Sequence, residues 1–491
     1  LLAMGGTASA SSCAQSLLDS QGYTYDTVAP PLAPTRDHTF ATLHDGGNAI
    51  SSNAWDDWGA LFVGGTDLAH LYFSSDNTDC AVGSGGQQLV FPTIPIGGLQ
   101  VQRKLFVSST GLPGARLLEL VTNPGPASVI TSVQVGDNQS ANQAGDLGSD
   151  AATAVRSTSN GNATLGAEDL WGVTSDHAGG ATNVTPALAH VFDGPGGASH
   201  VSSITLSGSD AVPQDNLVYR WSSVLIPPHS TAAFLSYEIQ QTAPDRSAAT
   251  EDAAARGVAL AYHGLPLTQV YAGMSDTEIA AVRNWPKPSP VAAIIARNGS
   301  DIKDVTLAAG GAPSTAAGVC QGASYAWNFD DGGFAVGQTV THRFAAGKHT
   351  ATLTVTNSCG VSAFNQKTIS IANAPPVVRV LLPKSITLRQ LITSRLVFAA
   401  TSNENASASI SGSIPKSVAR KSTRVKISPK ITSARLRLAA GTPGTVRLRP
   451  SSRAKRALKI LRKKGFKLTV IASVRDDAGK VTKVRRAVRI R

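Results

Sequence analysis

The sequence lacks the long apolar segments and compact motifs that would assign it to a membrane or to a known reaction. A transmembrane helix needs an apolar run of about 18 residues or more, and after the first ten residues no apolar run approaches that length. No Gly-x-Ser-x-Gly, His-Glu-x-x-His, P-loop or Gly-x-Gly-x-x-Gly pattern occurs. The ten histidines are scattered singly, and no cysteine or histidine cluster has the spacing of zinc ligands. These absences exclude the motif-defined hydrolases, nucleotide-binding proteins and zinc proteins.

Charged residues are also scarce, at 15% of the 491 residues, whereas glycine occurs 46 times. This composition is typical of an exported all-β protein with many turns, and the length predicts about three domains. Residues 1–10, LLAMGGTASA, have the character of the end of a signal peptide, with Ala8-Ser9-Ala10 as its cleavage site. A disordered N-terminus is the alternative interpretation. We therefore expect a secreted, extracellular protein that associates with the cell wall.

The charge that is present is segregated along the chain. Residues 377–491 hold 29 Lys and Arg against three acids, a net charge of +26, while the remainder has 15 against 29, a net charge of −14. These two values sum to the overall +12. The basic character therefore belongs to the C-terminal part alone.

One stretch, residues 325–359, has a specific pattern: YAWNFDDGG, then TVTHRFAAGKHTATLTVTNSCG. It resembles the polycystic kidney disease (PKD) repeat, an immunoglobulin-like β-sandwich of secreted and cell-surface proteins. The resemblance covers about residues 305–373, and the positions in register with the family pattern are Trp327, Phe329, Asp331, Gly332, Val340, His342, Phe344, Gly347, Leu353, Val355 and Asn357. It implies a fold and a compartment but no reaction.

The residues of this stretch favour the same fold independently. Residues 350–356 alternate Thr-Ala-Thr-Leu-Thr-Val-Thr, which is typical of a half-buried strand. Asp331-Gly332 supplies a turn after the strand that carries Trp327 and Phe329. Asn328 and Asp330 depart from the family pattern; Asp330 tolerates a tight turn because aspartate visits left-handed geometry. Carboxylates near this turn bind Ca²⁺ in some relatives, but Asn328 argues against it, so we expect a structural turn and no cofactor.

The four cysteines form two local groups, Cys13 with Cys80 and Cys320 with Cys359. An even number of cysteines in an exported chain favours disulfides. In the immunoglobulin-like sandwich that the resemblance implies, Cys320 and Cys359 lie in loops at the same end. We predict the bridges Cys13–Cys80 and Cys320–Cys359.

Residues 11–285 read as a large antiparallel β-sandwich with a helical tail. Turn residues separate strand-like segments, and a capping box at Ser275-Asp276-Thr277-Glu278 begins the second of two helices, after one at about residues 250–262. The short sequence segments at residues 147–150 and 168–171 resemble segments of secreted actinobacterial proteins that have a glycosidase-associated sandwich. The predicted strands are Leu99–Val107, Ala115–Thr122, Ser128–Val135, His200–Leu206, Leu217–Ile226 and Thr231–Gln240.

Residues 286–304, with alternating prolines at their start, are expected to be a linker and lead-in to the PKD-like domain at 305–373. Residues 377–491 alternate cations with aliphatic residues, as in Arg435-Leu436-Arg437-Leu438, and contain a helix at 452–464 and a hairpin around Asp476-Asp477. This part resembles the Arg-rich β-sandwich modules that end many exported actinobacterial proteins. The prediction is an all-β multidomain protein: a large N-terminal sandwich, an immunoglobulin-like PKD sandwich and a basic immunoglobulin-like domain.

The best candidate for a ligand contact is Trp55-Asp56-Asp57-Trp58. Aromatic faces stack on sugar rings, and carboxylates accept hydrogen bonds from hydroxyls. The alternative is one core tryptophan and two acids at a turn. Three adjacent Asp/His pairs (Asp37-His38, His44-Asp45 and Asp176-His177) are expected to have surface or capping roles, since strand neighbours point to opposite faces.

We therefore expect a non-catalytic, secreted binding or adhesion protein of the cell surface. The basic domain would bind an anionic envelope polymer or polysaccharide, and the N-terminal sandwich a polymer or another surface protein. A solvated face with no ligand is the alternative for the basic domain. Nucleic acid is disfavoured because residues 377–491 hold only two aromatic residues, Phe398 and Phe466. The competing hypothesis is a polysaccharide-active N-terminal enzyme, which requires distant acids such as Asp57, Asp150, Glu168 and Asp176 to converge.

Overall fold

The fold is given by a computed structural model in which about 53% of the described residues are strand and 11% helix, so the predicted all-β class is confirmed. Contacts divide the chain into two compact units. Unit 1 comprises residues 1–289, 314–322 and 357–361, and unit 2 comprises residues 290–313, 323–356 and 362–491. The structure describes residues 10–11, 13, 15–27, 43–49, 54–56, 58–64, 66–67, 80–136, 146–147, 153–175, 185–207, 216–243, 247–299, 301, 303–372, 374–415, 418, 430–460 and 465–491.

Unit 1 is built on a ten-stranded sheet with the order β1-β8-β9-β11-β12-β20-β17-β16-β15, with β10 paired to β11. All of its described pairings are antiparallel. Of the predicted signal-peptide segment, only Ala10 lies among the described residues, where it pairs with Ala81. The strands are β1 (Ala10–Ser11), β8 (Cys80–Gly83), β9 (Gln88–Val90), β10 (Ile94–Ile96), β11 (Leu99–Val107), β12 (Ala115–Asn123), β15 (Ala154–Thr158), β16 (Trp171–Ser175), β17 (Ala187–Val191) and β20 (Ser230–Gln241).

A second, five-stranded sheet faces the first with the order β18-β19-β13-β6-β7. Its strands are β6 (Leu61–Val63), β7 (Thr66–Asp67), β13 (Val129–Val135), β18 (Ser203–Ser207) and β19 (Asn216–Ile226). Leu117 and Phe234 of the large sheet share one hydrophobic core with Val133 and Trp221 of the small sheet. The predicted N-terminal sandwich is therefore present. Smaller sheets join β2 (Ser16–Leu18), β3 (Thr24–Thr27) and β4 (Leu43–Gly47), and β5 (Trp55–Asp56) and β14 (Asp146–Leu147).

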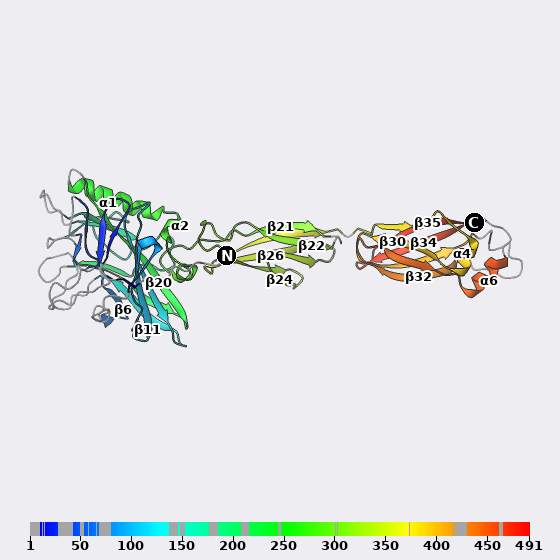
Figure 1. Ribbon diagram of the computed structural model, residues 1–491, viewed down its shortest axis with the longest axis horizontal. Helices are drawn as coiled ribbons and strands as arrows, with labels where there is room; N and C mark the ends of the chain where they lie inside the picture. Colours follow the sequence, from blue (N-terminus) through cyan, green and yellow to red (C-terminus); the bar gives the residue numbers. More distant parts are fainter. Residues whose placement is uncertain are drawn as a thin grey trace. The chain divides into compact units, whose positions relative to one another are not determined.

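Helices cover the other face of the ten-stranded sheet (Figure 1). They are α1 (Ala248–His263), α2 (Leu267–Val270) and α3 (Asp276–Ala281), and a short 3-10 turn, η1 (Ser84–Gly86), precedes β9. The predicted capping box of α3 is formed, with Ser275 and Glu278 each bonding the other's backbone N–H. Leu118 and Leu235 point to this side and form a second core with residues of the helices. Strands β12 and β20 are thus buried on both faces, and nearly all of their residues are buried, including the charged Arg116, Glu119 and Glu238.

The middle sandwich of unit 2 packs a three-stranded sheet, β21-β22-β25, against a four-stranded sheet, β24-β23-β26-β27. Trp327 and Phe329 are both buried in its core, as predicted, and Asp331-Gly332 is an exposed turn. Gly332, not Asp330, has the positive φ there, so the expected left-handed aspartate is wrong. The strands are β21 (Ala293–Asn298), β22 (Asp304–Gly310), β23 (Ala323–Phe329), β24 (Phe334–Val336), β25 (Thr339–Arg343), β26 (Gly347–Asn357) and β27 (Ser362–Ile371).

The C-terminal sandwich is a three-stranded sheet, β28-β30-β33, packed on a five-stranded sheet, β29-β35-β34-β31-β32. Of its pairings only β29 with β35 is parallel among the described strands. The predicted hairpin is β34–β35, and the described part of the predicted helix is α6. The elements are β28 (Val378–Leu381), β29 (Ser385–Ile386), α4 (Leu388–Thr393), β30 (Leu396–Ser402), β31 (Ala406–Ser413), β32 (Lys430–Leu438), β33 (Gly444–Leu448), α6 (Ser452–Ile460), β34 (Phe466–Asp476) and β35 (Val481–Ile490).

Both predicted disulfides are present. Cys13–Cys80 closes a span of 67 residues and Cys320–Cys359 a span of 39 residues, and no described cysteine is free. Each bridge restricts the unfolded chain, so each stabilises the folded state relative to it.

Candidate functional site

The outer surface of the C-terminal five-stranded sheet is the strongest candidate for a binding site, because alternation sorts its cations onto one face. In β34 and β35, residues such as Leu468, Val470 and Val488 point into the core, and the residues between them point outward. In β32, Leu438 likewise points into the core, and Arg435 and Arg437 point outward. We call the outward cations the cationic face: Arg435, Arg437, Lys467, Arg475, Lys483, Arg485 and Arg489, all exposed.

A row of serines runs through the middle of this face. Strand β31 lies between β32 and β34, and its outward residues are Ser407, Ser409, Ser411 and Ser413. In register, Ser407 lies between Arg437 and Arg475, and Ser409 lies between Arg435 and Ser473, whose other neighbour is Lys483. Ser407 is therefore flanked by a cation on both sides, and Ser409 by Arg435 on one side and, beyond Ser473, by Lys483 on the other.

The spacing suits a chain of anions. Outward residues of one strand repeat at about 7 Å, and β32 and β35 are three strand spacings apart, about 14 Å. Because the Debye length is about 8 Å at physiological ionic strength, neighbouring cations of the face act on one ligand together. The planar guanidinium of arginine also donates pairs of hydrogen bonds whose geometry matches the oxygens of phosphate and carboxylate groups.

Carboxylates do little to neutralise the face. No described Asp or Glu has an outward position on β31, β32, β34 or β35; Asp476 is buried, and Asp477 lies in the turn beyond β34. Asp477 is 4.0 Å from Arg437, whose side chain is 85% exposed. Lys467 and Arg489 are directly paired across β34 and β35, an arrangement of like charges that costs stability. A bound polyanion would relieve this repulsion.

The other sheet of the same domain differs. Its outward residues include Arg379 and Arg447, together with exposed Leu381 and Val397. Phe398 and Phe466, the two aromatic residues of residues 377–491, are buried. The described cationic face therefore has no ring on which a nucleic-acid base can stack, and this arrangement does not favour a nucleic-acid ligand.

The predicted site at Trp55-Asp56-Asp57-Trp58 has a different arrangement from the one that the sequence suggested. Trp55 and Trp58 are both 0% exposed; Trp55 packs on Tyr25, and Trp58 donates from Nε1 to the carbonyl of Leu217 at 2.9 Å. The indole faces thus pack in the sandwich core instead of forming an exposed platform for a sugar. Asp57 and the side chain of Asp56 lie outside the described residues, and their role stays a prediction.

The structure assembles instead a buried polar network that sequence reasoning missed. His190 Nδ1 is 2.5 Å from Glu238 Oε2, and its Nε2 is 2.8 Å from the hydroxyl of Thr174. Arg103 Nε donates to Glu119 Oε1 at 2.8 Å. Burial raises the pKa of Glu119 and of Glu238, although Arg103 opposes this for Glu119 and His190 opposes it for Glu238. The available signal was a lone charge inside an apolar strand, such as His190 in Ala-Leu-Ala-His-Val.

This network does not resemble an accessible active site. His190, Glu238, Arg103 and Glu119 are at most 1% exposed, so a substrate in solvent cannot reach them in this conformation. Of the acids whose convergence would indicate an enzyme, Asp57, Asp150 and Asp176 lie outside the described residues. Glu168 is exposed and accepts a hydrogen bond from Asn160. The enzyme hypothesis stays a prediction.

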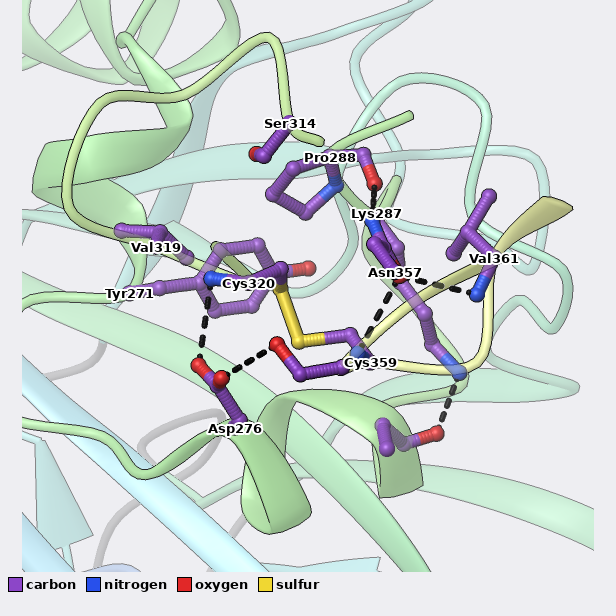
Figure 2. Close-up of a disulfide and its surroundings, with 12 residues drawn as sticks. Tyr271, Asp276, Lys287, Pro288, Ser314, Val319, Cys320, Asn357, Cys359 and Val361 are labelled. Carbon is purple, nitrogen blue, oxygen red and sulfur yellow. Dashed lines mark hydrogen bonds between the residues drawn. A yellow bond between two sulfur atoms is a disulfide. The ribbon is translucent and has the colours of Figure 1, made fainter. Parts of the chain in front are cut away.

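The Cys320–Cys359 bridge fixes two loops of unit 1 against α3 (Figure 2). Asp276, in the first turn of α3, accepts hydrogen bonds from the backbone N–H of Cys320 at 3.1 Å and from the hydroxyl of Ser358 at 2.5 Å. Asn357 completes the arrangement by donating to the carbonyl of Pro288. Asp276 and the two sulfurs form the one metal-like group among the described residues, but sulfurs in a disulfide supply no thiolate for a metal. The arrangement is structural.

We expect Asp276→Asn to loosen these loops by about 1–2 kcal/mol, because an amide cannot accept from both donors and its hydrogen bonds lack the charge. Amide hydrogen exchange at Cys320 measures the opening free energy. Thr277→Ala in the same helix is the control, since the Thr277 hydroxyl bonds to no described residue. Unchanged protection at Cys320 in Asp276→Asn would show that Asp276 does not hold the loop.

The carboxylates at the turn of the middle sandwich are also engaged within the protein. Asp331 lies 2.8 Å from His342 Nε2, and this hydrogen bond lowers the pKa of Asp331. Asp330 accepts from the backbone N–H of Thr350 and lies 3.0 Å from His349 Nδ1. The expected structural turn agrees with this geometry.

A family model described as "PKD domain" matches residues 287–372. The chain contains a PKD domain. The match begins earlier than the predicted boundary at 305, because β21 lies inside the segment predicted as a linker and pairs with β22. The PKD domain thus includes most of that segment. No helix among the described residues is both long enough and apolar enough to cross a membrane.

Solved structures similar to part of this chain include two PKD domains. The PKD1 domain of Vibrio anguillarum Epp is 22% identical, covers 17% of this chain and 94% of its own, and has a TM-score of 0.15. The PKD1 domain of the Vibrio cholerae metalloprotease PrtV is 26% identical, covers 17% of this chain and 99% of its own, and also has a TM-score of 0.15. No curated protein matches the chain.

Proposed function

We propose that this protein is an extracellular, non-catalytic surface protein that binds an anionic envelope polymer through the cationic face of its C-terminal domain. The observation that carries this proposal is the exposed array of seven cations around a serine strand, with no described carboxylate among its outward residues. The net charge of +26 in residues 377–491, against −14 elsewhere, confines the attraction to this end of the chain.

Two further features support an extracellular role. Disulfides such as these persist in an oxidising compartment. The PKD repeat, which residues 287–372 match, is a module of secreted and cell-surface proteins. The PKD domain would act as a spacer or interaction module. The N-terminal sandwich would then remain free for a polymer or a second surface protein.

The full-length protein tests this proposal in binding assays on immobilised polymers. We expect it to bind polyglycerol phosphate and purified cell wall at 50 mM salt, and to be released as salt rises, because screening weakens attraction between exposed charges. Dextran, a neutral polymer, is the control. Equal binding to dextran, or binding to the anionic polymers that ignores salt, would contradict a charge-based attachment.

A further inference from the structure

A cavity of about 360 Å³ lies on the helix side of the ten-stranded sheet in unit 1. Phe106, Arg116 and Tyr237 come from the strands, and Tyr262, Thr268 and Gln269 come from α1 and from α2 with its flanking residues. Gln269 is exposed and the tyrosines are buried, so the cavity runs from solvent toward the sheet. Its volume is at the lower end of that of small-molecule sites.

Arg116 is the unusual residue of this cavity. Arg116 is 1% exposed, and its guanidinium makes one well-aligned hydrogen bond, from Nη1 to the carbonyl of Val270 at 2.8 Å. The buried Nε and Nη2 make no well-aligned hydrogen bond to a described residue, and the neighbouring Tyr237 hydroxyl interacts with the guanidinium as a neutral polar group. One face of the group lies over the ring of Phe106, 4.8 Å from its centroid.

The positive charge of Arg116 also lacks a counter-ion. Burial raises the pKa of Tyr237 to about 12, so this neighbour is neutral at physiological pH. Glu278 is the carboxylate that acts on Arg116 from a distance, but it is bound to Lys104 at 2.5 Å and to the N-cap of α3. No described carboxylate lies within 4.0 Å of the guanidinium. A buried cation without a partner is costly, and an anionic ligand would remove that cost.

The free atoms define which anion fits. Nε and Nη2 lie on the same edge of the planar guanidinium and donate two parallel hydrogen bonds, the arrangement that binds a carboxylate through both of its oxygens. The remaining walls combine the rings of Phe106, Tyr237 and Tyr262 with the polar groups of Thr268 and Gln269. Such walls suit a sugar ring, which has apolar faces and a hydroxyl rim. We propose that this cavity binds a carboxylate-bearing sugar of monosaccharide size, held by the Nε–Nη2 edge of Arg116.

This site is independent of the cationic face, which lies in another domain, so either proposal stands if the other fails. The test is calorimetric or NMR titration of the full-length protein with D-glucuronate, D-glucose and inorganic phosphate. We expect glucuronate to bind with a dissociation constant in roughly the millimolar range and the other two probes at least about tenfold more weakly. Glucose or phosphate binding as tightly as glucuronate, or no binding of glucuronate at 50 mM, overturns the proposal.

Three variants test whether glucuronate binds in this cavity. Arg116→Lys keeps the positive charge but removes the two parallel donors Nε and Nη2, and it is expected to weaken glucuronate binding at least about tenfold. Arg220→Lys, on the opposite sheet, is the matched control and is expected to leave binding unchanged. Thr268→Trp fills the cavity and is expected to abolish binding while circular dichroism stays native, which keeps the test valid if Arg116→Lys fails to fold. Native affinity in a folded Thr268→Trp or Arg116→Lys protein overturns the assignment.

Discussion

Replacing Arg435, Arg437, Lys483 and Arg485 together by glutamine is expected to weaken binding to an anionic polymer by roughly 30- to 1,000-fold. Two of the side chains are on β32 and two on β35, on opposite sides of the serine row, so a polymer bound across the sheet contacts them as one set. Each exposed ion pair contributes about 0.5–1 kcal/mol, and four such contributions give this range. Binding of the full-length protein to polyglycerol phosphate at low salt measures the effect.

The matched control removes the same charge from elsewhere in the domain. Arg379, Lys384, Arg389 and Arg447 are exposed, and none lies on the cationic face. Their joint replacement by glutamine is expected to weaken binding only a few-fold, through the loss of net charge. An equal loss in both quadruple variants would mean that net charge, and not the arrangement of the face, determines attachment.

Trp327→Ala is expected to lower the stability of the PKD domain by about 3–5 kcal/mol. The indole is 1% exposed in the core of the sandwich, and its Nε1 donates to the carbonyl of Gly337 at 2.9 Å. Its removal therefore leaves a cavity and an unpaired carbonyl. Amide hydrogen exchange of β26 in the full-length protein reports the opening free energy of this domain alone, which global unfolding of a multidomain chain does not.

Phe364→Ala provides the control, because Phe364 is 74% exposed and is expected to change the same free energy by less than about 0.5 kcal/mol. A loss below 1 kcal/mol in Trp327→Ala would contradict the central place of the indole in the core.

The strands and the charge distribution were predictable because they depend on local alternation. Leu99–Val107 was predicted with its observed bounds, and the hairpin of the C-terminal domain was located by the Asp-Asp-Ala-Gly turn. The cationic face follows from the same rule, since period-two alternation places cations on one side of a sheet. What the local pattern did not provide was the strand order, which places serines of β31 between the cations of β32 and β34.

Long-range contacts explain what the sequence did not predict. Trp58 is buried against Leu217, 159 positions away, and nothing in Trp-Asp-Asp-Trp indicates that partner. The prolines at 286, 288 and 290 suggested a linker up to residue 304, but Ala293–Asn298 forms β21 by pairing with β22. Arg116 gave no signal, because a basic residue in a strand looks alike whether its guanidinium is solvated or buried in a cavity.

The salt dependence of binding tests the attachment most directly. Log K for the full-length protein on polyglycerol phosphate is measured from 50 to 300 mM salt, for the native chain and for the quadruple variant of the cationic face. If the four cations displace counterions from the polymer, the slope of log K against log salt is expected to become shallower by about three in the variant. Parallel lines for the two proteins would contradict binding through the cationic face.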